Sequence, residues 1–178
     1  YVLQIAGIAS PYYYRTFPLE TLEVTTLGTK NMLEIARQRS VRRFIFCSST
    51  SAYGDTPSGV ELISESAALA AEDIYGATKA SGDILTRAYA AQTGLDAIVL
   101  RFSWVYGPRR RTSCVIREMI KGAQFGRSVH VPYGRGFSRQ YVHISDVASS
   151  VQMALGAPAA QNARTFNITG GTRLDFAD

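Results

Sequence analysis

Residues 41–51 read Val-Arg-Arg-Phe-Ile-Phe-Cys-Ser-Ser-Thr-Ser, an apolar run that ends in a cluster of hydroxyl side chains. The apolar part has the length of a buried strand. Long helical patterns lie before it at 19–39 and after it at 73–92, and further strand-like runs lie at 1–6 and 97–102. This alternation predicts a parallel sheet with helices on both faces. Because ligands of such sheets bind beyond the carboxyl ends of the strands, the hydroxyl cluster is expected beside the ligand-binding site.

The pattern is looser after residue 107. Shorter elements are predicted there: a helix at 112–123, a strand at 141–144, a helix at 145–155 and a strand at 165–168. The sequence shows no internal repeat, no low-complexity tract and no clear linker.

Tyr75 and Lys79 stand four residues apart in the second predicted helix, so their side chains share one face. A phenol is a weak base at neutral pH because its ordinary pKa is about 10. A nearby ammonium favours the phenolate, so Lys79 is expected to lower the pKa of Tyr75. Ser49, at the end of the preceding strand, is placed to hydrogen-bond the substrate oxygen that Tyr75 deprotonates. The alternatives are a helix that carries this pair by chance and a Ser49 that only caps a turn.

Composition limits the classes of function. The chain has 178 residues, of which 46% are hydrophobic and 19% charged, which is typical of a globular domain. The net charge of +5 suits an anionic substrate, whereas no zinc-finger, RNA-binding or helix-turn-helix pattern indicates a nucleic-acid partner. No apolar run approaches the roughly 20 residues that cross a bilayer, and we recognise no signal peptide, so a cytoplasmic protein without a membrane partner is expected. Cys47 and Cys114 are expected to be reduced thiols, and two lone histidines give no metal site.

Several motifs, in order and spacing, resemble the extended short-chain dehydrogenases, the NAD-dependent epimerase/dehydratase family. They include Phe-Ile-Phe-Cys-Ser-Ser-Thr-Ser-Ala-Tyr-Gly at 44–54, Leu-Arg-Phe at 100–102, Val-Tyr-Gly-Pro at 105–108 and Arg-Gln-Tyr-Val-His-Ile-Ser-Asp-Val-Ala at 139–148. The resemblance implies a Rossmann-like doubly wound parallel sheet with part of a small C-terminal substrate-binding region. The family's glycine-rich pyrophosphate turn is not found, and residues 1–10 resemble its fourth strand and following loop. We therefore expect a partial sheet whose first three strands are missing.

Two regions follow from the resemblance. Residues 1–107 are expected to form the catalytic half of the dinucleotide-binding Rossmann domain. Residues 108–178 are expected to mix substrate-binding segments with a strand and helix that return to the Rossmann sheet. The long helices at 19–39 and 73–92 are expected to form a homodimer interface, as is usual in the family.

The resemblance implies a reaction in which Tyr75 takes a proton from a sugar hydroxyl while a hydride passes to the nicotinamide, giving a transient keto-sugar. The family's 4,6-dehydratases carry Asp and Glu after the serine, and its UDP-glucuronate decarboxylases carry a Glu there, whereas this chain has Thr50 and Ser51. We therefore predict a nucleotide-sugar epimerase-type oxidoreductase/isomerase that uses NAD rather than NADP.

Three alternatives stay open. One is an NAD(P)-dependent sugar or ketone reductase. Another is a UDP-glucuronate decarboxylase-like enzyme, whose loop resembles Ala-Ser-Pro-Tyr-Tyr-Tyr at 9–14. The third is a non-catalytic, cofactor-sensing scaffold.

The resemblance also assigns residues to the site. Catalytic roles fall on Ser49, Tyr75 and Lys79. Cofactor contacts are expected from Ala6, Gly7, Cys47, Ser48, Tyr75, Lys79 and Phe102. Substrate contacts are expected from Ser51, Trp104, Tyr133 and Arg139. Trp104 replaces a common family Asn, and Arg139 matches an arginine that binds the substrate phosphate, with a surface salt bridge as its alternative role. The arginines at 109–111 are expected to lie in a solvated loop, with a phosphate contact as their alternative role.

Overall fold

The computed structural model describes residues 1–55, 62–110, 112, 114–130 and 138–175. Its elements, in chain order, are β1 (Val2–Gln4), α1 (Pro11–Thr16), α2 (Pro18–Leu22), a π-helical turn (Glu23–Leu27), α3 (Gly28–Gln38), β2 (Phe44–Ser49), a 3₁₀ turn (Thr50–Tyr53), α4 (Ile74–Thr93), β3 (Ala97–Phe102), β4 (Trp104–Tyr106), α5 (Val115–Phe125), β5 (Ser138–His143), α6 (Ile144–Gly156), β6 (Arg164–Ile168) and β7 (Arg173–Asp175).

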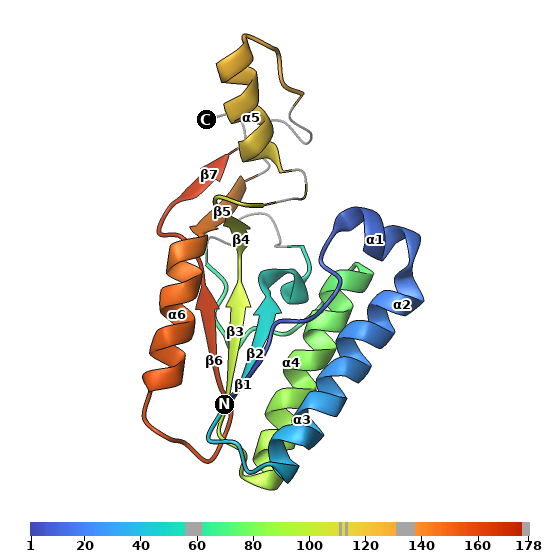
Figure 1. Ribbon diagram of the computed structural model, residues 1–178, viewed down its shortest axis with the longest axis vertical. Helices are drawn as coiled ribbons and strands as arrows, with labels where there is room; N and C mark the ends of the chain where they lie inside the picture. The colour runs from blue at the N-terminus through green and yellow to red at the C-terminus, as the bar shows by residue number, and fades with distance from the viewer. Residues whose placement is uncertain (56–61, 111, 113, 131–137, 176–178) are drawn as a thin grey trace.

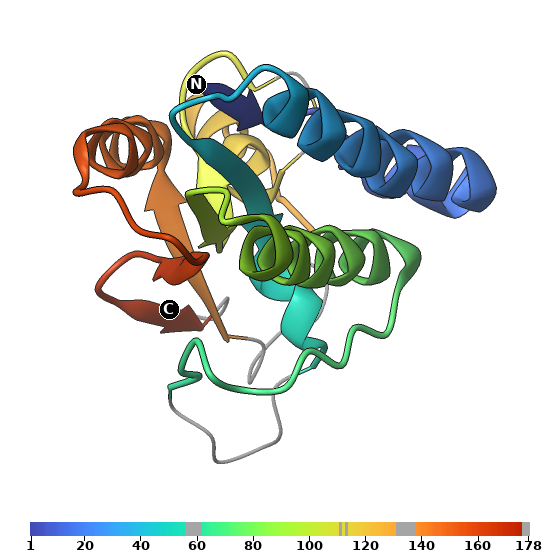
Figure 2. The same ribbon diagram turned by 90° about the horizontal axis from the view of Figure 1, so that it is seen from below.

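The main sheet is parallel and has the strand order β1-β2-β3-β6. Helices α3 and α4 cover one face and α6 covers the other (Figures 1 and 2). Successive side chains of β2 serve both layers: Phe44 and Phe46 pack with α3 and α4, whereas Ile45 and Cys47 pack with α6. The predicted doubly wound α/β fold is therefore confirmed.

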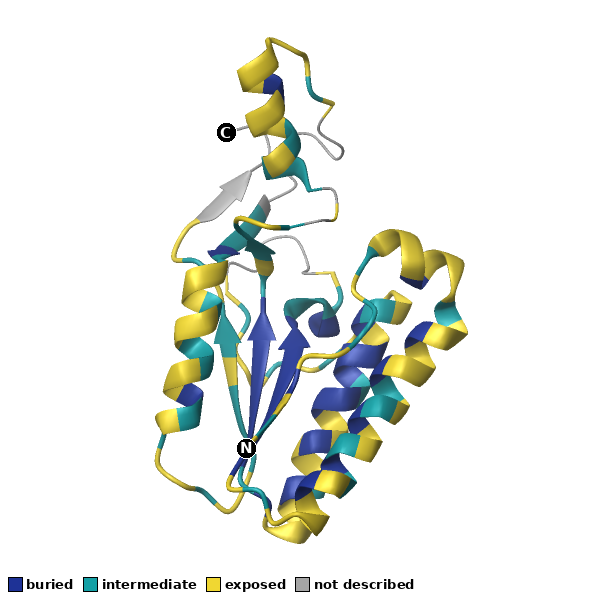
Figure 3. Ribbon diagram, viewed as in Figure 1, coloured by how far each residue is buried: buried dark blue, intermediate teal, exposed yellow. Residues whose placement is uncertain are grey.

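A smaller sheet of order β4-β5-β7 lies beyond the carboxyl ends of the main strands, together with α5 (Figure 1). The two sheets differ in burial: β2 and β3 of the main sheet are buried along their whole length, whereas most of α5, beside the smaller sheet, is exposed (Figure 3). Although β6 returns to the main sheet beside β3, the boundary expected at residue 107 remains a prediction.

The first long helix differs from its prediction. The run at 19–39 is broken by the π-helical turn, and α1 precedes it, separated from α2 by Phe17. Pro11 and Pro18 are the first residues of α1 and α2, positions where the missing N–H group leaves no helical hydrogen bond unmade. The aromatic loop after β1 is therefore helical.

The elements after residue 102 also shift. Strand β4 was not predicted, and the helix expected at 112–123 begins only at Val115, because Cys114 keeps an extended backbone (φ −150°, ψ 149°). Both cysteines are free thiols. Among the described residues, none of the helices combines the length and apolar composition needed to traverse a lipid bilayer.

Candidate active site

The predicted catalytic residues converge where β2 ends and α4 begins. Ser49, the last residue of β2, accepts a hydrogen bond from the Ser51 backbone N–H (3.1 Å) and so starts the 3₁₀ turn. Gly76 lies in the first turn of α4, where a Cβ atom would clash with the carbonyl oxygen of Ser51. Glycine at this position lets α4 start directly against the turn, which brings Tyr75 to Ser49.

The Ser49 hydroxyl is oriented toward the phenol. Its oxygen accepts the Ser51 N–H. A side-chain interaction with Ser49 acts to lower the pKa of the Tyr75 phenol. Burial acts more strongly in the opposite direction, so the pKa of Tyr75 lies above its ordinary value. The prediction that the pKa of Tyr75 is lowered is therefore wrong for the protein without ligands. Desolvation of the phenolate outweighs the effect of Ser49.

Lys79 is buried one turn further along α4, with a relative exposure of 5%. Its Nζ donates to the carbonyl oxygen of Cys47 (2.8 Å) and lies 5.4 Å from the ring centroid of Phe46. Burial lowers the pKa of Lys79. The ammonium is therefore held by the end of β2, on the face of α4 that carries Tyr75.

Tyr14 completes the surroundings of Tyr75 and was not identified from the sequence. The two rings stack with centroids 5.6 Å apart and planes 18° apart, and Tyr14 is 9% exposed. The aromatic run at 12–14 indicated only that this loop is rich in tyrosine. Which tyrosine reaches Tyr75 depends on α1, whose buried residue is Tyr14.

The residues expected to contact a cofactor line the same end of the sheet. A Cβ atom at Gly7 would lie 3.1 Å from Thr25 Oγ1 and 3.6 Å from Lys79 Nζ, so glycine keeps this place open. Thr25 Oγ1 is buried and has no hydrogen-bond partner among the described residues. A polar group of a ligand would satisfy this hydroxyl, so Thr25 is a candidate contact that the sequence prediction did not assign.

The other expected cofactor residues lie nearby. Ala6 adjoins Gly7 after β1, and Phe102 ends β3 directly beside Ser49 in register. Ser48 Oγ donates to the Lys79 carbonyl oxygen at 3.5 Å, which makes Ser48 a packing contact of α4.

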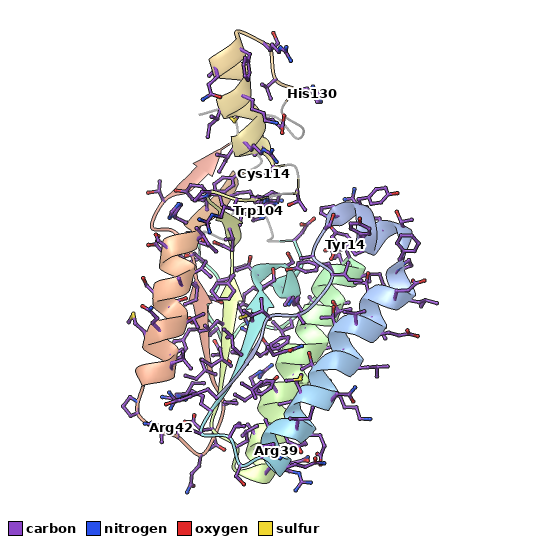
Figure 4. All side chains as sticks on the ribbon, viewed as in Figure 1. Tyr14, Arg39, Arg42, Trp104, Cys114 and His130 are labelled. Carbon is purple, nitrogen blue, oxygen red and sulfur yellow. The ribbon has the colours of Figure 1, made fainter. Side chains whose placement is uncertain are left out.

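Two of the expected substrate residues meet in the smaller sheet. The guanidinium carbon of Arg139 lies 5.3 Å from the ring centroid of Trp104. Trp104 and Tyr14 both lie beyond the carboxyl ends of the main strands, Trp104 toward α5 and Tyr14 on α1 (Figure 4). Ser51 is half-buried beside Ser49. Tyr133 falls outside the described residues.

The solvated loop expected at 109–111 is corrected at Arg110, which is half-buried, whereas Arg109 is exposed and Arg111 falls outside the described residues. Its Nη1 donates to the Val105 carbonyl oxygen (2.7 Å), so the chain after β4 folds back onto that strand.

A buried ion pair fixes α4 to the sheet beneath the site. Asp83 lies on the face of α4 that carries Tyr75 and Lys79, and its carboxylate accepts from Arg101 Nε at 2.7 Å and Nη2 at 3.1 Å. Arg101 Nη1 also donates to the Tyr53 hydroxyl (2.6 Å), at the end of the turn that starts at Ser49. Strand β3, helix α4 and the turn are thereby joined through one guanidinium.

Fold and geometry together define a class: a doubly wound α/β protein whose serine, tyrosine and lysine side chains converge at the carboxyl end of a central strand. A model of the NAD dependent epimerase/dehydratase family matches residues 1–169. The chain therefore belongs to this family.

Individual relatives agree with this assignment. The chain is 31% identical over 170 residues to the uncharacterized UDP-glucose epimerase YtcB of Bacillus subtilis (strain 168), covering 95% of this chain and 52% of that protein. It is 33% identical over 155 residues to the dTDP-glucose 4,6-dehydratase of Streptomyces niveus, covering 86% and 44%. The solved structure of MoeE5 in complex with UDP-glucuronic acid and NAD matches with a TM-score of 0.86 and 28% identity, over 98% of this chain and 57% of that one. The chain thus spans about half the length of these relatives.

Proposed function

We propose that the protein is an NAD-dependent nucleotide-sugar epimerase that oxidises a sugar hydroxyl reversibly. This proposal rests on the convergence of Ser49, Tyr75 and the buried Lys79 where β2 ends and α4 begins, with Thr50 and Ser51 in place of carboxylates. Support comes from relatives named as a UDP-glucose epimerase and as a complex with UDP-glucuronic acid and NAD.

Each of the three residues has a distinct role. Tyr75 is the general base for the sugar hydroxyl. Ser49 donates to the phenol oxygen and orients the substrate hydroxyl, and Lys79, held by the Cys47 carbonyl, supplies a positive charge and hydrogen bonds to a ribose. The cofactor is assigned to the space beside Gly7, Ala6 and Thr25. When bound there, it would supply the hydride acceptor and donor of the reaction.

Epimerisation is favoured over elimination by the acid–base groups near the phenol. Elimination of water needs a further proton donor and acceptor, and the residues after Ser49 carry hydroxyl groups only. The Asp73 carboxylate lies close enough to raise the pKa of Tyr75, but its Oδ1 accepts the backbone N–H of Gly76 (2.6 Å) as the cap of α4. Reversible oxidation of one hydroxyl requires no acid–base group beyond Tyr75.

The substrate that we propose is a nucleoside diphosphate sugar, with uronates included. Arg139 supplies the guanidinium for the diphosphate, since its planar fork donates two parallel hydrogen bonds to such groups. A direct test incubates the full-length protein with NAD and either UDP-glucose or UDP-glucuronic acid and resolves the products by NMR. The C4 epimer without net reduction of NAD supports the proposal, whereas a dehydrated or decarboxylated product contradicts it.

Replacement of Ser49 is expected to move the pH dependence of the reaction. Ser49→Ala removes the hydrogen bond that lowers the pKa of Tyr75, so that pKa rises further and less phenolate is present at a given pH. The rising limb of kcat/KM against pH therefore moves to higher pH. Ser48→Ala is the matched control, because Ser48 donates to the Lys79 carbonyl oxygen and not to the phenol. The rising limb of kcat/KM against pH should stay unchanged in this variant. An unmoved limb in Ser49→Ala would sink the role given to Ser49.

We also propose a homodimer formed through α3 and α4. Large apolar side chains remain exposed on this pair of helices, at the end of α2 and in the π-helical turn that follows it: Leu22, Leu27, Ile35, Ile84 and Leu85. Such a surface in two copies provides the apolar area on which dimers depend.

A charge in this surface is expected to separate the dimer. Ile84→Asp places a carboxylate on the half-exposed part of α4, where association would bury it without a partner. Light scattering coupled to size-exclusion chromatography should show a monomer for Ile84→Asp and a dimer for the control Ile120→Asp, whose exposed side chain lies on α5. Equal masses for both variants would contradict this interface.

A further inference from the structure

One face of the smaller sheet carries an aromatic and cationic row. Strands β4 and β5 are parallel neighbours, with Trp104 opposite Tyr141 and Tyr106 opposite His143. Because side chains alternate along a strand, these four residues and Arg139 share one face. The rings of Trp104 and Tyr141 meet edge to face, with centroids 6.2 Å apart, and Tyr106 meets Tyr141 in the same way at 6.2 Å.

Trp104 supports the guanidinium of Arg139. The distance of 5.3 Å between the guanidinium carbon and the ring centroid lies within the range of a cation–π contact. Trp104 remains 40% exposed, so the indole supports the cation at the edge of the solvent instead of in the core. The edge contact with Tyr141 fixes the plane of the indole, which in turn fixes the surface on which Arg139 lies.

A second guanidinium acts at the same place. Burial raises the pKa of the Tyr141 phenol, and the positive charges of Arg139 and Arg110 both act against this rise. Arg110 is tied to β4 through its bond to the Val105 carbonyl, and its buried Nε lacks a hydrogen-bond partner among the residues that the structure describes. Two cations at one point favour a ligand with more than one negative charge.

We propose that Trp104 is a positioning residue that holds Arg139 toward the diphosphate of the nucleotide sugar, with Arg110 as the second cation of this site. This inference rests on the proposed function, which supplies the diphosphate ligand. The indole, through its π face, sets the affinity for the diphosphate without bonding it. Trp104 thus acts on ground-state binding and not on the chemical step at Tyr75.

The test measures UDP binding by isothermal titration calorimetry in the full-length protein. Trp104→Leu keeps an apolar side chain but removes the π face, so the Kd for UDP should rise about threefold to thirtyfold, the range that one cation–π contact covers. Trp104→Phe keeps an aromatic face and should bind UDP more tightly than Trp104→Leu. For the nucleotide sugar, KM should rise in Trp104→Leu while kcat falls far less, a division that a general packing defect would not produce.

Two controls separate this effect from packing. Tyr106→Leu removes an edge contact to Tyr141 on the same strand face but leaves the Trp104–Arg139 contact in place, so its Kd for UDP should stay within about twofold of the original. In an Arg139→Ala background, Trp104→Leu should add almost nothing, because its effect passes through that guanidinium. If Trp104→Leu fails to fold, Trp104→Met serves in its place.

The possible results separate the role of Trp104 from the proposed function of the protein. Equal UDP affinity in the original protein, Trp104→Leu and Trp104→Phe would overturn the role of Trp104 while the proposed function stands. The role of Trp104 would also be overturned if the losses of UDP affinity in Arg139→Ala and Trp104→Leu added up in the double variant. A loss of UDP affinity in Tyr106→Leu as large as in Trp104→Leu would overturn it too. An original protein that binds NAD but no UDP would refute the diphosphate ligand and with it the proposed function.

Discussion

The variant Tyr75→Phe is expected to lower kcat by about 10²- to 10⁴-fold, the usual contribution of a general acid–base group. The ring and its stacking with Tyr14 remain, whereas the oxygen that accepts the Ser49 hydrogen bond and takes the substrate proton is lost. Binding of cofactor and substrate should change little, because the phenol oxygen acts mainly in the transition state. Steady-state rates of epimer formation, with NAD binding measured separately, check this result.

The matched control is Tyr13→Phe, which removes a hydroxyl from an exposed tyrosine of α1 and should leave kcat unchanged. A Tyr75→Phe protein that keeps more than about a tenth of the original kcat would remove Tyr75 from the role of base, because that loss is below the range of general-base catalysis. Such a result would leave the fold unaffected and would move the search for the base to the neighbouring hydroxyl groups.

The second large effect concerns stability. Asp83→Ala is expected to reduce the free energy of unfolding by about 3–5 kcal/mol, because it leaves a buried guanidinium without its carboxylate. Arg101 is 1% exposed and Asp83 is fully buried, and two hydrogen bonds join them. Denaturant unfolding of the original and variant proteins, compared at equal m values, measures the difference.

Two comparisons make this prediction specific. Glu34→Ala breaks an ion pair with Arg37 that lies on the exposed surface of α3, so its loss of stability should be much smaller. The double variant Asp83→Ala/Arg101→Met removes both charges and should recover part of the lost stability. If Asp83→Ala is no more destabilising than Glu34→Ala, the buried pair does not hold α4 to β3.

The central strands and helices followed from the sequence because their signals are local. The apolar run at 44–47 and the one at 97–102 are the lengths of buried strands, and the structure places them side by side in the sheet. The spacing of Tyr75 and Lys79 places both on one face of any helix, so their proximity needed no tertiary information. Ser49 could be joined to them because strand ends of a parallel sheet share one edge.

What the sequence did not predict depends on contacts between distant segments. Asp83 and Arg101 are each unremarkable charged residues until α4 packs on β3 and removes water from both. The pKa of Tyr75 was expected to fall, but burial raises it, and the degree of burial is a property of the folded site. The stacking of Tyr14 likewise needed the position of α1, which begins at Pro11 and which the helical pattern at 19–39 did not indicate.

Deuterium placed at C4 of UDP-glucose distinguishes reversible oxidation at one sugar carbon from elimination and from net reduction of the cofactor. The full-length protein is incubated with the labelled substrate and NAD, and the label is located by NMR and mass spectrometry. Reversible oxidation by Ser49, Tyr75 and Lys79 predicts that the C4 epimer forms and keeps its deuterium at C4, with no loss of water. Deuterium that moves to C6 of a dehydrated sugar, or that leaves with released reduced nicotinamide, would contradict it.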